Sequence, residues 1–142
     1  MKKGREGSAF RNTMSMKQYL NGIQHLGLPT NDMDKTIAFY ESLGFTIPYE
    51  TRMGEDRVVF LQLGDLVLEC YTDTPAVMKN GAIDHLAIDV SDIDAVFAEA
   101  KAAGYQILED EVQFLPFWEK GVRFFNIVGP NAETVEFSQK LS

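Results

Sequence analysis

The chain has 142 residues, of which 45% are hydrophobic and 24% are charged, and its net charge is −8 at pH 7. This length is sufficient for one domain with its own hydrophobic core, and the acidic balance argues against nucleic acid or an anionic membrane as a partner. The single cysteine, Cys70, cannot form an internal disulfide, and no apolar run is long enough to cross a bilayer. We therefore expect a cytoplasmic protein.

Residues 1–20 are expected to form a flexible N-terminal extension. Lys2, Lys3 and Arg5 supply early positive charge, but the apolar segment that a signal peptide needs does not follow them. Residues 21–142 are predicted to form a single domain, with one module at 21–73 and a second module at 81–141.

The sequence predicts the same order of elements, β-α-β-β-β, for both modules. The first module reads as a strand at 23–28, a helix at 33–43 and strands at 45–50, 57–63 and 66–71. The second module reads as a strand at 83–90, a helix at 93–103 and strands at 106–112, 122–128 and 134–138. Helical spacing of apolar residues identifies the helices, and a glycine ends each of them, at Gly44 and Gly104. The pattern predicts an α+β fold in which the modules form a cupped mixed sheet, with the helices outside.

An internal repeat underlies this order and pairs the only two histidines. His25 and His85 stand 60 residues apart, and so do the helix-ending glycines Gly44 and Gly104. A repeat of fixed period indicates two copies of one structural unit. Packed copies can bring equivalent strands together, so both imidazole rings can face one point.

A glutamate recurs in the last strand of each module. Glu69 interrupts an apolar run, and Glu136 stands between two apolar residues and therefore faces the other side of its strand. His85 and Glu136 are 51 residues apart, against 44 for His25 and Glu69, and we attribute the difference to a loop insertion around 113–120. Two imidazoles and two carboxylates would bind one divalent metal ion, Ni²⁺, Co²⁺, Zn²⁺, Mn²⁺ or Fe²⁺, with two positions left for water or substrate.

With these residues in place, the chain resembles the vicinal oxygen chelate superfamily, which includes glyoxalase I, methylmalonyl-CoA epimerase, extradiol dioxygenases and fosfomycin-resistance proteins. The resemblance extends over residues 22–141 and is most specific at His25–Pro29, Thr36–Phe45 and Val128–Glu136. It implies paired β-α-β-β-β modules with a metal ion in the cupped sheet. The ligand positions of its isomerase and lyase branches match the four residues named above.

Because the chain has a matching residue at all four ligand positions, it resembles only some branches of the superfamily. Extradiol dioxygenases use two histidines and one glutamate on iron, usually with further histidines, whereas this chain has no third histidine. Antibiotic-sequestering relatives generally lack the metal set. The chain is therefore most similar to glyoxalase I, a lactoylglutathione lyase, with an acyl-thioester epimerase of the methylmalonyl-CoA type as one alternative. A non-catalytic small-molecule binding or resistance protein of the same fold is another.

The resemblance to glyoxalase I implies proton transfer next to a carbonyl group, through an enediolate that the metal stabilises. Glu136 or Glu69 would act as the base, and we favour Glu136 because the longer loop of the second module could shape the substrate pocket beside it. Glyoxalase I commonly carries an arginine soon after its first histidine, but no basic residue lies between His25 and Lys35 here. The choice between glutathione and another thiol therefore stays open. A homodimer is also implied, and the four ligands could come from one chain or from two.

Four further residues are candidates for substrate binding. Phe114, Phe117 and Trp118 belong to an aromatic segment between strands, which could form an apolar wall over the metal, a dimer contact or a cover for the sheet edge. Arg123 lies in a predicted strand and could hold a substrate carboxylate or form a surface ion pair.

Overall fold

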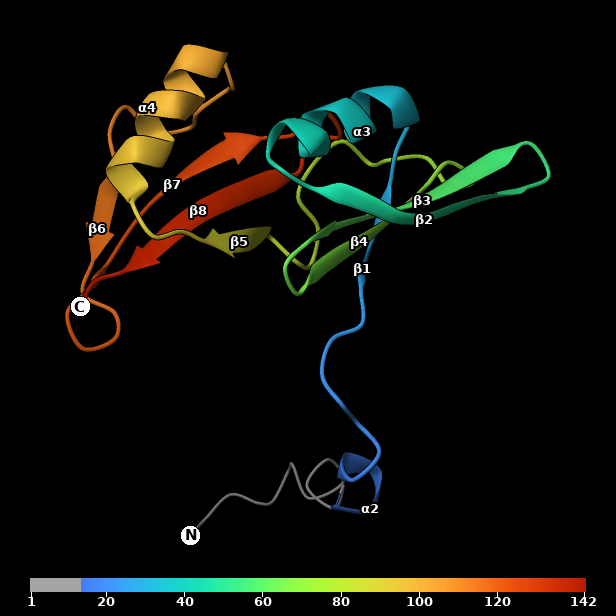
Figure 1. The fold of residues 1–142 in the computed structure, drawn as a ribbon, viewed down its shortest axis with the longest axis horizontal. Coiled ribbons are helices and arrows are strands. Elements are labelled where there is room, and N and C mark those ends of the chain that lie inside the picture. The colour runs from blue at the N-terminus through green and yellow to red at the C-terminus, as the bar shows by residue number, and fades with distance from the viewer. Residues whose placement is uncertain (1–13) are drawn as a thin grey trace, which may run out of the picture.

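Two four-stranded sheets, one from each module, form the frame of the molecule (Figure 1). The structure is a computed structural model, and it describes residues 14–142. In chain order the elements are α2 (Met14–Lys17), β1 (Leu26–Pro29), α3 (Met33–Ser42), β2 (Thr46–Met53), β3 (Asp56–Leu63), β4 (Leu66–Tyr71), β5 (His85–Asp89), α4 (Ile93–Ala103), β6 (Gln113–Leu115), β7 (Val122–Val128) and β8 (Thr134–Lys140). The predicted α+β class and the order of elements in both modules are confirmed.

The two sheets share one topology. Their strand orders are β1-β4-β3-β2 and β5-β8-β7-β6, and in each sheet the first strand of the module pairs in parallel with the last. Gly27 lies opposite Glu69, and Ala87 lies opposite Glu136. Because side chains two residues apart in an extended chain face the same side, His25 and His85 each come next to the glutamate of the neighbouring strand.

The helices α3 and α4 lie where the sequence predicts them, whereas the short α2 falls within the extension and was not predicted. The side chains of Asp32 and Asp92 accept hydrogen bonds from the backbone N–H groups of Lys35 and Ala95, which caps the first turns of α3 and α4. Gly104 ends α4 with a φ of 80°, a left-handed conformation that costs glycine little.

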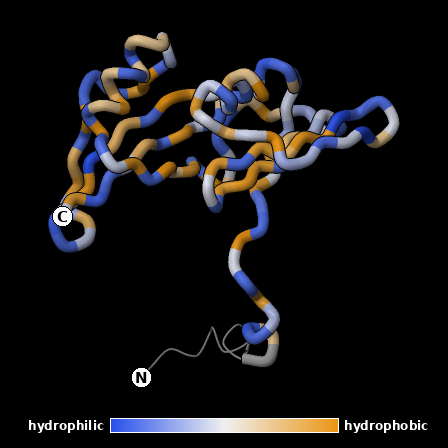
Figure 2. Tube along the Cα trace, viewed as in Figure 1, coloured by the Kyte–Doolittle hydropathy of each residue, from blue (hydrophilic) through white to orange (hydrophobic). Residues whose placement is uncertain are grey.

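One face of each sheet is covered by the helix of its own module. In β3 the buried residues Val59 and Leu61 alternate with the less buried Phe60, and in β7 the fully buried Phe125 and Ile127 flank Asn126. Figure 1 shows α3 and α4 above the sheets, and Figure 2 shows apolar residues, in orange, along the strands of both. The side chains that point away from the helices form what we call the open face.

A hydrogen-bonded joint connects the two modules. The Tyr40 hydroxyl of α3 donates to Glu133 Oε2 at 2.8 Å, and Glu133 Oε1 accepts from the backbone N–H of Asn131 at 2.7 Å. Asn131 Nδ2 then donates to Thr36 Oγ1 at 3.0 Å, back on α3. Burial, followed by the charge of Glu133, raises the pKa of Tyr40 far above its ordinary value of 10.0, so the hydroxyl remains a donor. The turn between β7 and β8 is thereby fixed against the first module.

The structure corrects the predicted strand at 106–112. Within that range only Ile107 forms a bridge, to Ile127. The second strand of the second module is instead the short β6, which lies inside the segment expected to be a loop insertion. Three successive carboxylates at 109–111 explain the difference, because acidic side chains are disfavoured in strands. The first of them, Glu109, turns its side chain onto Asn126.

The start of the domain also differs in detail. The strand predicted at 23–28 begins only at Leu26, and the segment before it leads away from the sheets to α2 (Figure 1), with Tyr19 and Ile23 largely exposed. The flexibility predicted for the extension falls partly on residues 1–13, which lie outside the described residues. Within residues 14–142, no helix is long and apolar enough to span a membrane.

Candidate metal centre

The predicted ligands lie together in two His–Glu pairs on the open face. His25 Nε2 is 3.3 Å from Glu69 Oε1, and His85 Nε2 is 3.0 Å from Glu136 Oε1. The parallel pairing of the first and last strand of each module produces both contacts. We call them the first pair and the second pair.

Both rings direct the same nitrogen at the carboxylate. His25 Nδ1 lies 2.9 Å from Gln24 Oε1, and His85 Nδ1 lies 2.9 Å from Asp84 Oδ2, so in each ring Nδ1 can be the donor. In that tautomer Nε2 carries a free lone pair, and it faces a carboxylate oxygen that is also an acceptor. A ligand histidine commonly donates its second ring nitrogen in this way, which fixes its orientation toward the metal. The residues of each pair therefore fit a divalent cation.

One chain does not gather all four ligands in one place. Within the described residues, no three potential ligand side chains lie close enough together to hold a metal ion. Each pair therefore supplies two donors, whereas a stable site for a divalent metal of this kind normally takes three or four from the protein. The environments of the pairs also differ, because the Glu69 side chain is 31% exposed and that of Glu136 only 16%.

The second pair lies in a pocket of about 520 Å³. Its apolar wall consists of Leu108, Leu115, Phe117, Trp118, Val122 and Phe124. Trp118 has a φ of 64°, and the Lys140 ammonium lies 4.0 Å from the centre of its ring. Phe114, the third aromatic candidate, does not line this pocket and packs against Gly121 instead. Of the predicted aromatic residues, Phe117 and Trp118 thus lie beside the second pair.

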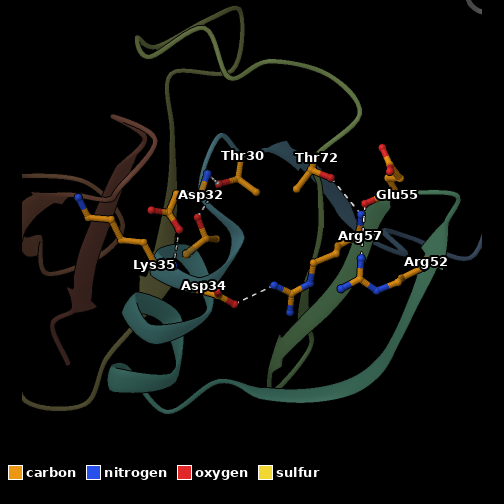
Figure 3. Close-up of polar contacts among 9 residues, drawn as sticks. Thr30, Asp32, Asp34, Lys35, Arg52, Glu55, Arg57 and Thr72 are labelled. Atoms are coloured by element: carbon orange, nitrogen blue, oxygen red, sulfur yellow. Dashed lines mark hydrogen bonds and ion pairs between the residues drawn. The ribbon is translucent and has the colours of Figure 1, made fainter.

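Arg123 points to the helix side of its sheet. Its guanidinium donates to both carboxylate oxygens of Asp94 on α4, at 2.8 and 2.9 Å, and it does not line the pocket of the second pair. These hydrogen bonds hold the pKa of Asp94 below its ordinary value of 3.8. Arg57 forms the equivalent contact in the first module, to Asp34 of α3 at 2.7 Å (Figure 3). The geometry therefore gives Arg123 a structural ion pair in place of the substrate contact that was expected.

Asn126 is a polar residue of the pocket that the sequence analysis did not identify. It lies opposite Glu136 in the register of β7 and β8, whereas the equivalent neighbour of Glu69 is Phe60. The Phe60 ring contacts His25 edge to face, with centroids 5.7 Å apart. The available signal was an asparagine between the apolar residues Phe125 and Ile127, because a buried strand has few polar residues without a reason.

The comparisons with known proteins identify the family of the chain. Residues 22–113 match the family model of the Glyoxalase/Bleomycin resistance protein/Dioxygenase superfamily. The chain therefore belongs to this superfamily, which confirms the resemblance seen in the sequence.

Individual relatives place the chain within a varied group. It is 29% identical to the uncharacterized protein YwbC of Bacillus subtilis (strain 168) over 128 residues, 83% of this chain and 97% of that protein. Its fold is similar to that of the fosfomycin resistance protein FosX from Listeria monocytogenes, crystallised with Mn(II) and sulfate (TM-score 0.68, 15% identity, 86% of this chain and 94% of the other). It is equally similar to TnmS3, an antibiotic-binding protein from Streptomyces sp. CB03234 (TM-score 0.68, 19% identity, 86% and 98%). At these identities the two structures indicate the fold alone.

Proposed function

We propose that this protein is a metal-dependent isomerase or lyase of the glyoxalase I type, acting on a small α-oxo substrate or its thiol adduct. The observation that carries the proposal is the geometric equivalence of the two His–Glu pairs. Two matched pairs in a repeated fold supply two neutral nitrogens and two negative oxygens, which suits one divalent cation.

The complete site takes its ligands from two chains in this proposal. His25 and Glu69 of one protomer would meet His85 and Glu136 of a second copy, because one chain holds the pairs apart. The open face supports this arrangement, since Tyr49, Met53, Phe117 and Trp118 expose 54–69% of their surface there. Exposed apolar groups on one face are typical of a surface that a partner covers.

Glu136 would be the proton acceptor. When bound, the metal supplies Lewis-acid stabilisation of negative charge on the substrate oxygens. Glu136 is the less exposed of the two glutamates and borders a pocket with an apolar wall, so a substrate bound in that pocket would lie within reach of its carboxylate. Phe117 and Trp118, which line the same pocket, would exclude water from the reacting carbon.

Metal content tests the site, and a mixed dimer tests its two-chain construction. We expect about one divalent metal ion per chain in the wild-type protein and none in His25→Ala or His85→Ala. A purified dimer of one His25→Ala chain and one His85→Ala chain keeps one unaltered site, made from the two unaltered pairs. It should therefore bind one metal ion per two chains. No metal in the mixed dimer would contradict a shared site, and no metal in the wild-type protein after addition of Ni²⁺, Co²⁺, Zn²⁺ or Mn²⁺ would contradict the metal centre.

The proton-transfer chemistry has its own assay. The metal-loaded protein should convert an α-oxo aldehyde in the presence of a suitable thiol, and a screen of thiols would identify the co-substrate. Glu136→Gln should lose roughly a hundredfold or more in rate, whereas Glu99→Gln, an exposed carboxylate of α4, should not. Equal rates for the two variants would exclude Glu136 as the base.

A small-molecule binding protein is the second candidate. The exposed aromatic side chains of Phe117 and Trp118 beside the pocket favour it, because such surfaces bind flat apolar ligands without catalysis. Binding of an aromatic antibiotic that persists in excess chelator would support this candidate, and binding that requires metal would support the enzyme.

A further inference from the structure

The register of the second sheet places an amide beside the proposed base. Asn126 and Glu136 lie directly opposite each other on β7 and β8, and both line the pocket of the second pair. Directly opposed residues of an antiparallel pair have Cβ atoms about 4.5–5.5 Å apart, so one small ligand can contact both side chains. In the first module Phe60 takes this position and offers no polar group.

Glu109 fixes the orientation of the Asn126 amide. Its Oε1 accepts from the backbone N–H of Asn126 and its Oε2 accepts from Asn126 Nδ2, both at 2.7 Å. Because an ionised carboxylate can only accept, the nitrogen of the amide must face Glu109 and the oxygen must face the other way. An amide already held by a hydrogen bond to a carboxylate that is itself tied to the same residue's backbone also loses little further entropy when it binds a ligand.

The amide keeps one donor and one acceptor for a ligand. Among the described residues, the second Nδ2 hydrogen and the Oδ1 atom of Asn126 have no further partner. If Asn126 Oδ1 were fully buried, it would be a buried polar atom without a hydrogen-bond partner, and the described residues contain no such atom. Oδ1 is therefore accessible, on a residue that lines the pocket. A donor next to an acceptor is complementary to a hydroxyl group, which both donates and accepts, whereas a carbonyl oxygen can use only the donor.

We propose that Asn126 binds a substrate hydroxyl beside Glu136 and that Glu109 is the positioning residue that orients it. The inference rests on the proposed function, which places the substrate at Glu136, and it narrows the substrate class. The ligand is a compound with a hydroxyl group next to a carbonyl group, as in the thiol adduct of an α-oxo aldehyde. Removing the amide should lower the affinity for such a ligand by about tenfold, which is the effect of losing one hydrogen bond.

Two neutral probes that differ by one hydroxyl test the assignment. Hydroxyacetone and acetone are titrated into the Zn²⁺-loaded protein, followed by the ¹H–¹⁵N signals of the side-chain amides, and Zn²⁺ affinity is measured separately by calorimetry. Wild-type protein should prefer hydroxyacetone, and the Asn126 signal should shift on binding. In Asn126→Leu the preference should fall about tenfold while Zn²⁺ affinity stays unchanged.

A matched pair of variants isolates the role of Glu109. Glu109→Gln can donate as well as accept, so the Asn126 amide is free to turn over, and the preference for hydroxyacetone should fall although the hydrogen-bonded shape is kept. Glu111→Gln changes the same charge two residues away on an exposed side chain and should behave as the wild type. Melting temperatures of both variants show whether folding has changed, and Glu109→Gln serves as the second variant if Asn126→Leu does not fold.

The outcomes separate this inference from the proposed function. Zn²⁺ binding with an undiminished preference in Asn126→Leu would overturn the role of Asn126 and leave the metal site intact. Equal preferences in Glu109→Gln and Glu111→Gln would overturn the positioning role of Glu109. Absence of Zn²⁺ from the wild-type protein would overturn the metal site, and with it the hydroxyl contact that depends on it.

Discussion

The two modules share their scaffold and differ beside their glutamates. Both place a histidine against a glutamate through a parallel strand pair, and both tie an arginine of the third strand to the first turn of the helix. Beside Glu69, however, stands the phenyl ring of Phe60, and beside Glu136 stands an amide held by Glu109. The repeated His–Glu pairs therefore supply the proposed metal ligands, and the positions at which the two modules differ are where a substrate could be recognised.

The joint between the modules is a second point of asymmetry. Tyr40 of α3 is fully buried and reaches Glu133 of the second module, whereas the repeat places the small, buried Ala100 at the equivalent position of α4. At this position of the repeat, only the first module therefore offers a hydroxyl to the other. This contact and the Asn131–Thr36 hydrogen bond together orient the turn that precedes β8, and hence the strand that carries Glu136.

The largest expected effect comes from breaking that joint. Tyr40→Ala should lower the free energy of unfolding by about 3–5 kcal/mol, because it leaves a cavity. Tyr40→Phe, which removes only the hydroxyl, should cost about 1–3 kcal/mol because Glu133 loses a donor. Ala100→Gly, the matched change in α4, should cost about 1 kcal/mol. Urea unfolding measures all three, and equal losses for Tyr40→Phe and a surface control would mean that the joint contributes nothing.

The next effect concerns a thiol that only the first module contains. Cys70 of β4 is buried where the equivalent residue of β8 is Phe137, and burial, followed by the charges of Glu133 and Glu69, raises the pKa of Cys70 from 9.0 to about 12. A raised folded-state pKa means that the unfolded chain ionises first. The stabilising contribution is therefore complete below pH 9 and is lost as the pH rises toward 12.

Alkaline unfolding measures this contribution. Between those two pH values, ionisation of the thiol should lower the free energy of unfolding of the wild-type protein by about 1.4 kcal/mol per pH unit. In Cys70→Ala the free energy of unfolding should fall less steeply with pH. A thiol reagent should label Cys70 only after unfolding. Identical slopes for the two proteins would show that Cys70 ionises as easily in the folded chain as in the unfolded one.

A smaller effect tests the contact that the modules share. Arg123→Met and Arg57→Met should each lower the melting temperature by a few degrees at most, since exposed ion pairs contribute little. Because Arg123 holds the pKa of Asp94 below 3.8, its contribution is present above that pH and is lost as the pH falls through the lowered value. The Arg123→Met deficit should therefore vanish in acid. A deficit that is independent of pH would indicate lost packing instead of a lost ion pair.

The same pair of arginines shows what the sequence could predict. The repeat and the period of apolar residues were sufficient for the element order, the two main helices and the choice of four candidate ligands, because these depend on patterns within the sequence. The position of Arg123 on the helix side was not predicted, because Asp34 and Asp94 are 60 residues apart whereas Arg57 and Arg123 are 66 apart, so the fixed period does not align the two arginines. The role of Glu109 was not predictable, because it depends on how the chain bends after Ile107. Whether the two pairs meet in one chain depends on the packing of the modules, which no local pattern encodes.

The smallest expected effect concerns Trp118, the only tryptophan of the chain. The Lys140 ammonium lies over its ring, and the first module has no corresponding contact within the described residues. Lys140→Met should cost about 0.5–1 kcal/mol, as exposed cation–π contacts do, and should change the emission of Trp118. Because Trp118 lines the pocket of the second pair, bound Ni²⁺ should quench this emission in the wild-type protein and in Lys140→Met alike. Quenching that disappears with His85→Ala would locate the metal at the second pair, whereas quenching that persists there would place it elsewhere.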